Sequence, residues 1–148
     1  MNTKDMIAEL RRRKAEMVSN READGLKIAL DQIALVKLRI QQTGINSDGQ
    51  KFAPYVPAYV KTRKKGGYQV EFVDLTRTGR LFAGIVPTVS KSTPFSVEID
   101  IAPADQHGKD ILAGLSKKRP NILKPNRAEQ AMIQEANRQR VFKYLKFS

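Results

Sequence analysis

The sequence contains no cysteine and no tryptophan, and it has a single histidine. Without cysteine the chain can form neither a disulfide nor a thiolate nucleophile nor a cysteine metal site. No run of about 18 apolar residues occurs, so we expect no membrane-spanning segment and no membrane partner. The first residues, MNTKDMIAELRRRKAEM, lack the apolar centre of an export signal. A reducing cytoplasm is compatible with this composition.

Motifs of catalysis are also missing. His107, in ADQHGKD, belongs to no His-x-x-x-His or His-x-x-Glu-His pattern, and we interpret it as a loop histidine that makes local hydrogen bonds. Residues 44–49, GINSDG, match no Walker loop, dinucleotide fingerprint or calcium loop, and no Gly-x-Ser-x-Gly elbow is present. We therefore expect no enzyme, no metal and no cofactor. A metal-dependent nuclease is kept as an alternative, and its only candidate carboxylates are Asp100, Asp105 and Asp110.

What the sequence does have is positive charge. Lys and Arg number 27 against 15 acidic residues, for a net charge of +12, which favours polyanions or acidic proteins as partners. No zinc finger, basic zipper or RNA-recognition motif occurs, so the charge predicts non-specific phosphate attraction rather than base readout. Each cluster taken alone is also compatible with plain solvated surface. The four clusters are Arg11, Arg12, Arg13 and Lys14; Lys61, Arg63, Lys64 and Lys65; Lys117, Lys118 and Arg119; and Arg138, Arg140, Lys143 and Lys146.

Residues 3–42 read as one long helix, capped by Asn2 or Thr3 and free of proline. Its second half is apolar on two strips, one through Leu26, Ala29, Leu30, Ile33 and Ile40 and one through Ile28, Leu35 and Leu38. Gly25 is the expected bend point. The basic first part, residues 1–25, is expected to project as an arm.

Residues 43–67 are expected to form a long loop, because Pro54 and Pro57 disfavour regular structure near them. The loop carries Phe52, Tyr55 and Tyr59, so we expect it to pack down as an ordered loop or short helix. KTRKKGG would then be its basic, flexible tip.

The rest of the chain predicts a small sheet and two helices. Residues 68–75 and 95–102 alternate as strands do, and a short helix or strand is expected to end at Pro87. A short helix is expected at 108–118, closed by Pro120. A final helix begins with a capping box, Asn126 three residues before Glu129. The expected fold is a single α+β domain over residues 1–148, with a long N-terminal helix, a small antiparallel β-sheet with long ordered loops, and a C-terminal helix.

An ordered set of short motifs resembles the virion morphogenesis and tail-completion proteins of tailed bacteriophages. Members of that family carry a Gly-x-x-Phe-x-x-Tyr loop, a basic stretch, a Leu-x-x-Thr-Gly-x-Leu motif, a His-Gly pair and an Arg-Pro pair. The chain departs from the pattern in IAPADQ before His-Gly and in Asn121 after Arg-Pro. The matching residues are Gly49, Phe52, Tyr55, Leu75, Thr78, Gly79, Leu81, His107, Gly108, Arg119 and Pro120.

The resemblance implies a structural protein of the phage neck or tail, made in the cytoplasm of the bacterial host, which joins head to tail or completes the tail. It implies a ring of six or twelve copies around the DNA channel, with portal, adaptor and tail proteins as partners. The basic residues would face either the packaged DNA or acidic neighbouring subunits. We interpret Thr78-Gly79 as a structural corner, in which glycine permits a positive φ or a close backbone approach and a threonine hydroxyl satisfies a loop amide. The alternative from charge alone is a small basic protein that binds nucleic acid non-specifically.

Overall fold

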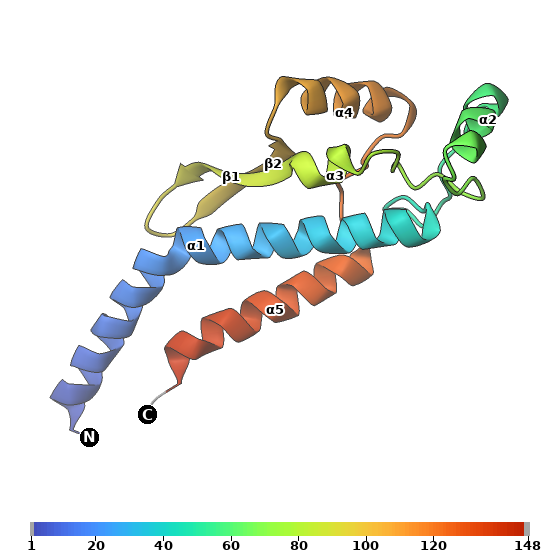
Figure 1. Ribbon diagram of the computed structural model, residues 1–148. Helices are drawn as coiled ribbons and strands as arrows, with labels where there is room; N and C mark the ends of the chain where they lie inside the picture. Colours follow the sequence, from blue (N-terminus) through green and yellow to red (C-terminus); the bar gives the residue numbers. More distant parts are fainter. Residues whose placement is uncertain (1, 147–148) are drawn as a thin grey trace.

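The computed structural model describes residues 2–146 and confirms the α+β arrangement. Figure 1 shows a two-stranded sheet as the middle layer, with the long helix α1 across one face and α4 over the other. α5 runs back along α1. In chain order the elements are α1 (Thr3–Thr43), α2 (Pro57–Lys65), α3 (Arg80–Gly84), β1 (Ile85–Ser92), β2 (Val97–Pro103), α4 (Gln106–Lys118) and α5 (Arg127–Leu145).

Helix α1 spans 41 residues. Asn2 caps it, as predicted, and its Oδ1 accepts a hydrogen bond from the main-chain N–H of the first turn at 2.9 Å. Ala29, Val36 and Ile40 are buried. These buried residues are spaced seven and four positions apart and so lie on one face of the helix. Leu30 lies at the edge of that face and is 52% exposed. Only part of the predicted apolar surface of this helix is covered by the chain itself.

Helix α1 is bent, and its N-terminal part runs at an angle to the part that lies along the sheet (Figure 1). Gly25, the expected bend point, lies against β2, where an added Cβ would stand 3.4 Å from Ile99 Cδ1. Residues 3–12 are exposed apart from the half-buried Glu9. From Arg13 onward the helix is tied to α5, because Arg13 Nη1 donates to the main-chain oxygen of Tyr144 at 3.4 Å. The first three turns therefore extend beyond the contact with α5.

The sheet pairs β1 with β2 in antiparallel fashion, from Ile85 opposite Pro103 to Ser92 opposite Val97. The predicted strand at 95–102 is confirmed as β2 except at its start, because β2 begins at Val97 and Phe95 is 91% exposed. The predicted end at Pro87 is wrong, since β1 continues through it. In a two-stranded sheet each strand is an edge strand, which tolerates the missing N–H of proline.

The predicted strand at 68–75 is wrong: this segment is irregular. The Gln69 side chain holds it, with Oε1 accepting from the main-chain N–H groups of Glu71 and Phe72 at 3.0 and 3.3 Å and Nε2 donating to the oxygen of Phe72 at 2.8 Å. These bonds occupy main-chain groups that a strand ladder would use. Segment 85–92 pairs with β2 instead.

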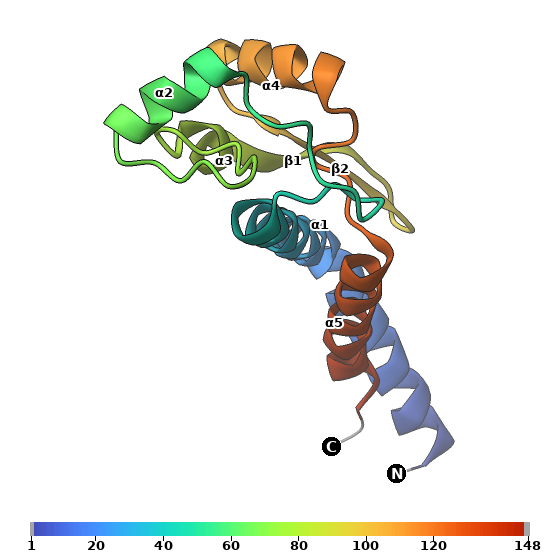
Figure 2. The same ribbon diagram turned by 90° about the vertical axis from the view of Figure 1, so that its right-hand side faces the viewer.

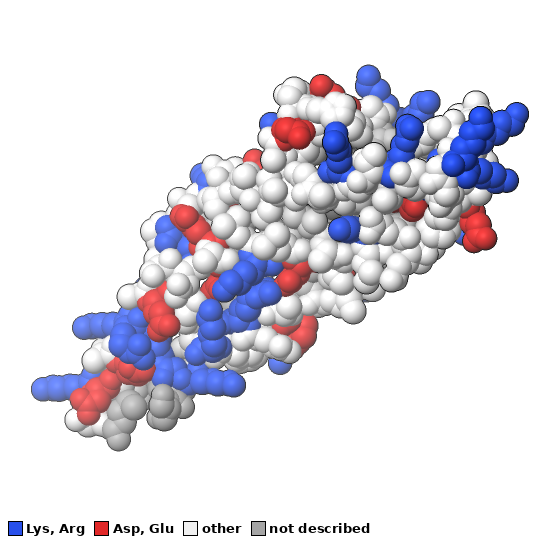
Figure 3. Space-filling view, in the orientation of Figure 1, with Lys and Arg blue, Asp and Glu red and all other residues white. Residues whose placement is uncertain are grey.

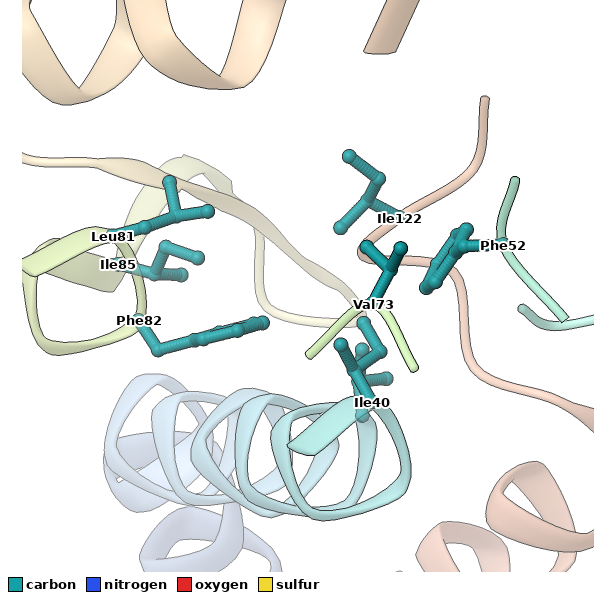
Figure 4. Packing of buried hydrophobic residues seen from close by; sticks show 8 residues of the cluster. Ile40, Phe52, Val73, Leu81, Phe82, Ile85 and Ile122 are labelled. Carbon is teal, nitrogen blue, oxygen red and sulfur yellow. The ribbon is translucent and has the colours of Figure 1, made fainter. Parts of the chain in front are cut away.

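The core lies where α1, the 68–75 segment, α3 and the loop after α4 meet (Figure 4). Ile40 comes from α1, Val73 from the irregular segment, and Ile122 from the loop after α4. The members of this cluster are Val36, Ile40, Phe52, Val73, Leu81, Phe82, Ile85 and Ile122. Residues far apart in the sequence are thereby fixed around one point.

The loop after α1 is ordered and its second half is helical. Helix α2 begins at Pro57, contrary to the expectation that this proline disfavours helix nearby. A proline at the first helical position lacks an N–H that would have no intrahelical partner anyway. The expected flexible tip, KTRKKGG, is instead the last part of α2 and the turn that follows.

Helix α5 opens with the predicted capping box, in which Glu129 N donates to Asn126 Oδ1 at 2.8 Å and Asn126 N donates to Glu129 Oε2 at 2.7 Å. Glu129 also accepts from Arg39 Nε at 2.8 Å, which ties the start of α5 to the end of α1. Figure 2, looking along α1, shows α5 on the side of the molecule away from α2 and α4. Two apolar residues of α5, Met132 and Leu145, are more than half exposed.

Candidate functional site

A buried arginine joins α2 to the motif segment. Arg63 is 2% exposed, and its Nη2 donates to both carboxylate oxygens of Asp74, at 3.0 and 3.1 Å. Its Nε and Nη1 donate to the main-chain oxygens of Gln69 and Thr76 at 3.0 and 2.7 Å. The planar guanidinium holds its donors in fixed directions, so this one side chain binds a carboxylate and two main-chain carbonyls at once. Arg63 was expected to contact DNA or another subunit, and its burial contradicts that role.

Three tyrosines surround this ion pair. The Arg63 guanidinium lies 4.6 Å from the ring centre of Tyr55, with Tyr59 and Tyr68 at 5.9 and 5.5 Å. The Tyr55 hydroxyl donates to Asp74 Oδ1 at 3.0 Å. Burial, followed by this hydrogen bond, raises the pKa of Tyr55 to about 12. The motif tyrosine is therefore held neutral over the physiological range.

The segment Leu75 to Gly79 makes two left-handed backbone turns. Gly79 has φ +72° directly before α3 and nothing within 4 Å of an added Cβ, so of the two predicted reasons for this glycine the positive φ is confirmed and the close backbone approach is wrong. Leu75 also has a positive φ, 53°, which is uncommon for a bulky residue and stays in place because Leu75 packs on the core. The threonine that hydrogen-bonds is Thr76, which accepts from Gln41 at 2.9 Å. Thr78 makes no hydrogen bond within residues 2–146 through its hydroxyl.

These elements enclose a pocket of about 700 Å³ between α2, the 75–81 segment and α4. One wall is the Tyr55–Tyr59 pair, whose rings meet edge to face at 5.2 Å. The lining residues are Ala53, Pro54, Tyr55, Val56, Tyr59, Arg63, Leu75, Thr76, Arg77, Thr78, Gly79, Arg80, Leu81, His107, Ile111, Leu115, Lys118 and Arg119. Seven of the eleven motif residues are in this lining.

Two motif residues that are not in the lining, Phe52 and Gly108, support it from outside. Phe52 is in the core beneath it. Gly108 lets the start of α4 approach β2, because a Cβ there would stand 2.7 Å from Pro103 Cβ. Arg119 Nη2 donates to the main-chain oxygen of Ala53 at 3.1 Å and so links α4 to the loop before α2. Gly49 lies outside the pocket, in the turn 46–50.

Pro120 is followed by Asn121, with φ +61°, which with Leu75 makes two non-glycine residues of positive φ in residues 2–146. Asparagine adopts this conformation more readily than most side chains. The left-handed conformation gives a backbone reason for asparagine at this position. The turn then brings Ile122 into the core.

The four basic clusters come together in pairs at opposite ends of the molecule (Figure 3). Those of α1 and α5 are largely paired with acids: Arg12 and Arg13 bind Glu9 at 2.7 and 2.6 Å. Hydrogen bonds from Arg12 and then Arg13 lower the pKa of Glu9 to about 2. In the same way Arg140 binds Asp31 at 2.6 Å.

At the α2 and α4 end the cations other than Arg63 are unpaired within residues 2–146. Within residues 2–146, none of the following forms an ion pair: Lys61, Lys64, Lys65, Arg77, Arg80, Lys117, Lys118 and Arg119. This end of the molecule carries the candidate site, and the free positive charge lies beside it (Figure 3).

Over the described part of the chain, no three His, Asp or Glu residues gather in a way that could hold a metal ion, so Asp100, Asp105 and Asp110 do not converge as the nuclease alternative requires. No helix in residues 2–146 is long and apolar enough to cross a membrane.

Sequence reasoning did not single out Asp74, Arg77 or Arg80. The signal was present, since Asp74 lies between Val73 and Leu75 and the two arginines flank Thr78-Gly79 inside the motif. Comparison of the chain with protein-family models, curated proteins and solved structures gave no match in any of the three.

Proposed function

We propose that this chain is a structural protein of the tailed-phage virion, which joins head to tail or completes the tail as one subunit of a ring around the DNA channel. The observation that carries the proposal is the convergence of the motifs. They are spread from Gly49 to Pro120 in the sequence, yet most of them line or support one pocket.

The shape of the molecule supports a role in assembly. Apolar side chains are exposed at separate places, with Phe95 at the hairpin tip 91% exposed, Leu38 on α1 and Met132 on α5. A ring subunit must present different surfaces to its two neighbours, because head-to-tail contacts are heterologous. Copies of this chain, in a ring of six or twelve, and the portal, adaptor and tail proteins are the proposed partners. The proposed role is not enzymatic.

Virions purified from the phage whose genome carries this gene test the proposal. An antibody against the chain should detect it in the particles at a few copies, and gold-labelled antibody should mark the junction of head and tail. Absence from purified virions that are fully infectious would contradict it.

The second candidate is a small basic protein that binds nucleic acid without sequence preference. The unpaired cations at the α2 and α4 end favour this candidate. In a ring subunit the same cations would be available for contacts with the packaged DNA. Electrophoretic mobility shift with duplex DNA separates the two readings. A nucleic-acid-binding protein should bind as a monomer at moderate salt with a steep salt dependence, whereas an isolated ring subunit should bind weakly.

A further inference from the structure

The pocket between α2 and α4 has an apolar interior. Leu75 and Leu81 lie on one side, Ile111 and Leu115 of α4 on the other, and Val56, 63% exposed, lies at its edge. Its volume of about 700 Å³ falls within the range of sites that enclose small ligands, roughly 300–1,000 Å³. An apolar side chain that entered would remove surface on both partners from water.

Positive charge lines the same pocket without any acid. Arg77, Arg80, Lys118 and Arg119 contribute to the lining, and no Asp or Glu is among its described residues. None of the four is in an ion pair within residues 2–146. Arg119 Nε is buried and lacks a hydrogen-bond partner. A buried donor without an acceptor gains most when a ligand supplies one.

We infer that this pocket binds a short acidic segment of another protein, with an apolar side chain of the segment inside and its carboxylates on the arginines at the rim. Arginine suits this role because its guanidinium forms two parallel hydrogen bonds to a carboxylate. The identification of the partner as a neighbouring virion protein rests on the proposed function. The preference of the pocket for an acidic segment with an apolar side chain does not rest on it.

A second copy of the chain fits less well. The sequence contains no two consecutive acidic residues, and Glu9, Asp24, Asp31, Asp74 and Glu129 are engaged by cations of their own chain. A nucleic acid backbone would use the charge but has no group for the apolar interior. An acidic segment with an apolar side chain uses both.

Fluorescence anisotropy on the full chain tests the inference. The probe is a fluorescein-labelled peptide, Asp-Glu-Leu-Phe-Glu-Asp, and two companions separate its parts. One replaces the carboxylates with amides, and the other replaces Leu-Phe with Gly-Ser. The probe should bind about tenfold more tightly than either companion, because one companion lacks the carboxylates for the arginines and the other lacks the apolar side chain for the interior.

Two charge-reversal variants locate the site. Arg77→Glu with Arg80→Glu changes two exposed residues of the pocket and should weaken probe binding about tenfold or more. Arg11→Glu with Lys14→Glu makes the same change in net charge on exposed residues at the other end of the molecule, and it should leave binding within about twofold. If the first pair disturbs folding by circular dichroism, Arg80→Gln with Lys118→Gln replaces it.

Equal weakening by both pairs would overturn the inference, because binding would then follow net charge alone. Equal affinity for the probe and the Gly-Ser companion would also overturn it. So would displacement of the probe from Arg11→Glu/Lys14→Glu by duplex DNA, because nucleic acid would then compete for the intact pocket. These outcomes use the isolated chain, so they leave the proposed virion role standing. Conversely, specific peptide binding by a chain absent from virions would support the pocket and contradict the proposed function.

Discussion

Replacing Arg63 with alanine tests the buried network beneath the pocket. The change removes the bidentate partner of Asp74, which is 8% exposed, and leaves the carbonyls of Gln69 and Thr76 without their donor. Breaking a buried ion pair from one side costs about 3–5 kcal/mol, because the remaining charge stays buried without compensation. A domain typically has about 5–15 kcal/mol of stability in total, so the variant should fold but only marginally.

Urea unfolding followed by circular dichroism measures the loss. The midpoint should fall for Arg63→Ala, and its thermal midpoint should drop by about 10 °C or more. Lys64→Ala is the matched control, because Lys64 is the exposed neighbour in the same helix and should stay within about 0.5 kcal/mol of the natural chain.

A double-mutant cycle shows that the loss comes from the pair itself. Arg63→Met and Asp74→Asn should each destabilise strongly, while the two together should cost about 1–3 kcal/mol less than the sum. A loss below about 1 kcal/mol for Arg63→Ala, or additive effects in the cycle, would refute the assigned role of this ion pair.

Three further predictions concern single residues of the site. The pKa of Tyr55 is raised to about 12, so the stability that its protonated hydroxyl contributes should be complete below about pH 10 and lost as the pH rises toward 12. In a titration followed by absorbance at 295 nm, one tyrosine should ionise later than the others. That late transition should be absent from Tyr55→Phe. Gly79→Val should destabilise the chain by more than about 1 kcal/mol, since valine at φ +72° is strained, and an unchanged urea midpoint would contradict this. Gly108→Ala should lower the thermal midpoint because its Cβ would stand 2.7 Å from Pro103, whereas Gly114→Ala, with open space around it, should not.

Local signals in the sequence were sufficient for the elements that depend on local chemistry. The capping box of Asn126 and Glu129, the alternation in 97–103 and the positive φ at Gly79 are each decided within a few residues. The sequence also placed the ordered loop after α1, because its aromatic side chains required a covered surface.

What the sequence did not reveal depends on contacts between distant segments. Residues 68–75 alternate like a strand, but Gln69 satisfies their main chain and segment 85–92 takes the place beside β2. Arg63 looks like part of a solvated basic tip until α2 forms and turns it toward Asp74. The pocket likewise exists only because α4, which begins at Gln106, covers the motif segment.

The most direct test of the proposed role is electron microscopy of lysates from the phage carrying a stop codon in this gene. The account predicts DNA-filled heads lying apart from tails, or tails with abnormal ends, and recovery of joined particles when the natural chain is supplied in trans. Normal numbers of joined, infectious particles without the chain would contradict it and favour the nucleic-acid-binding alternative.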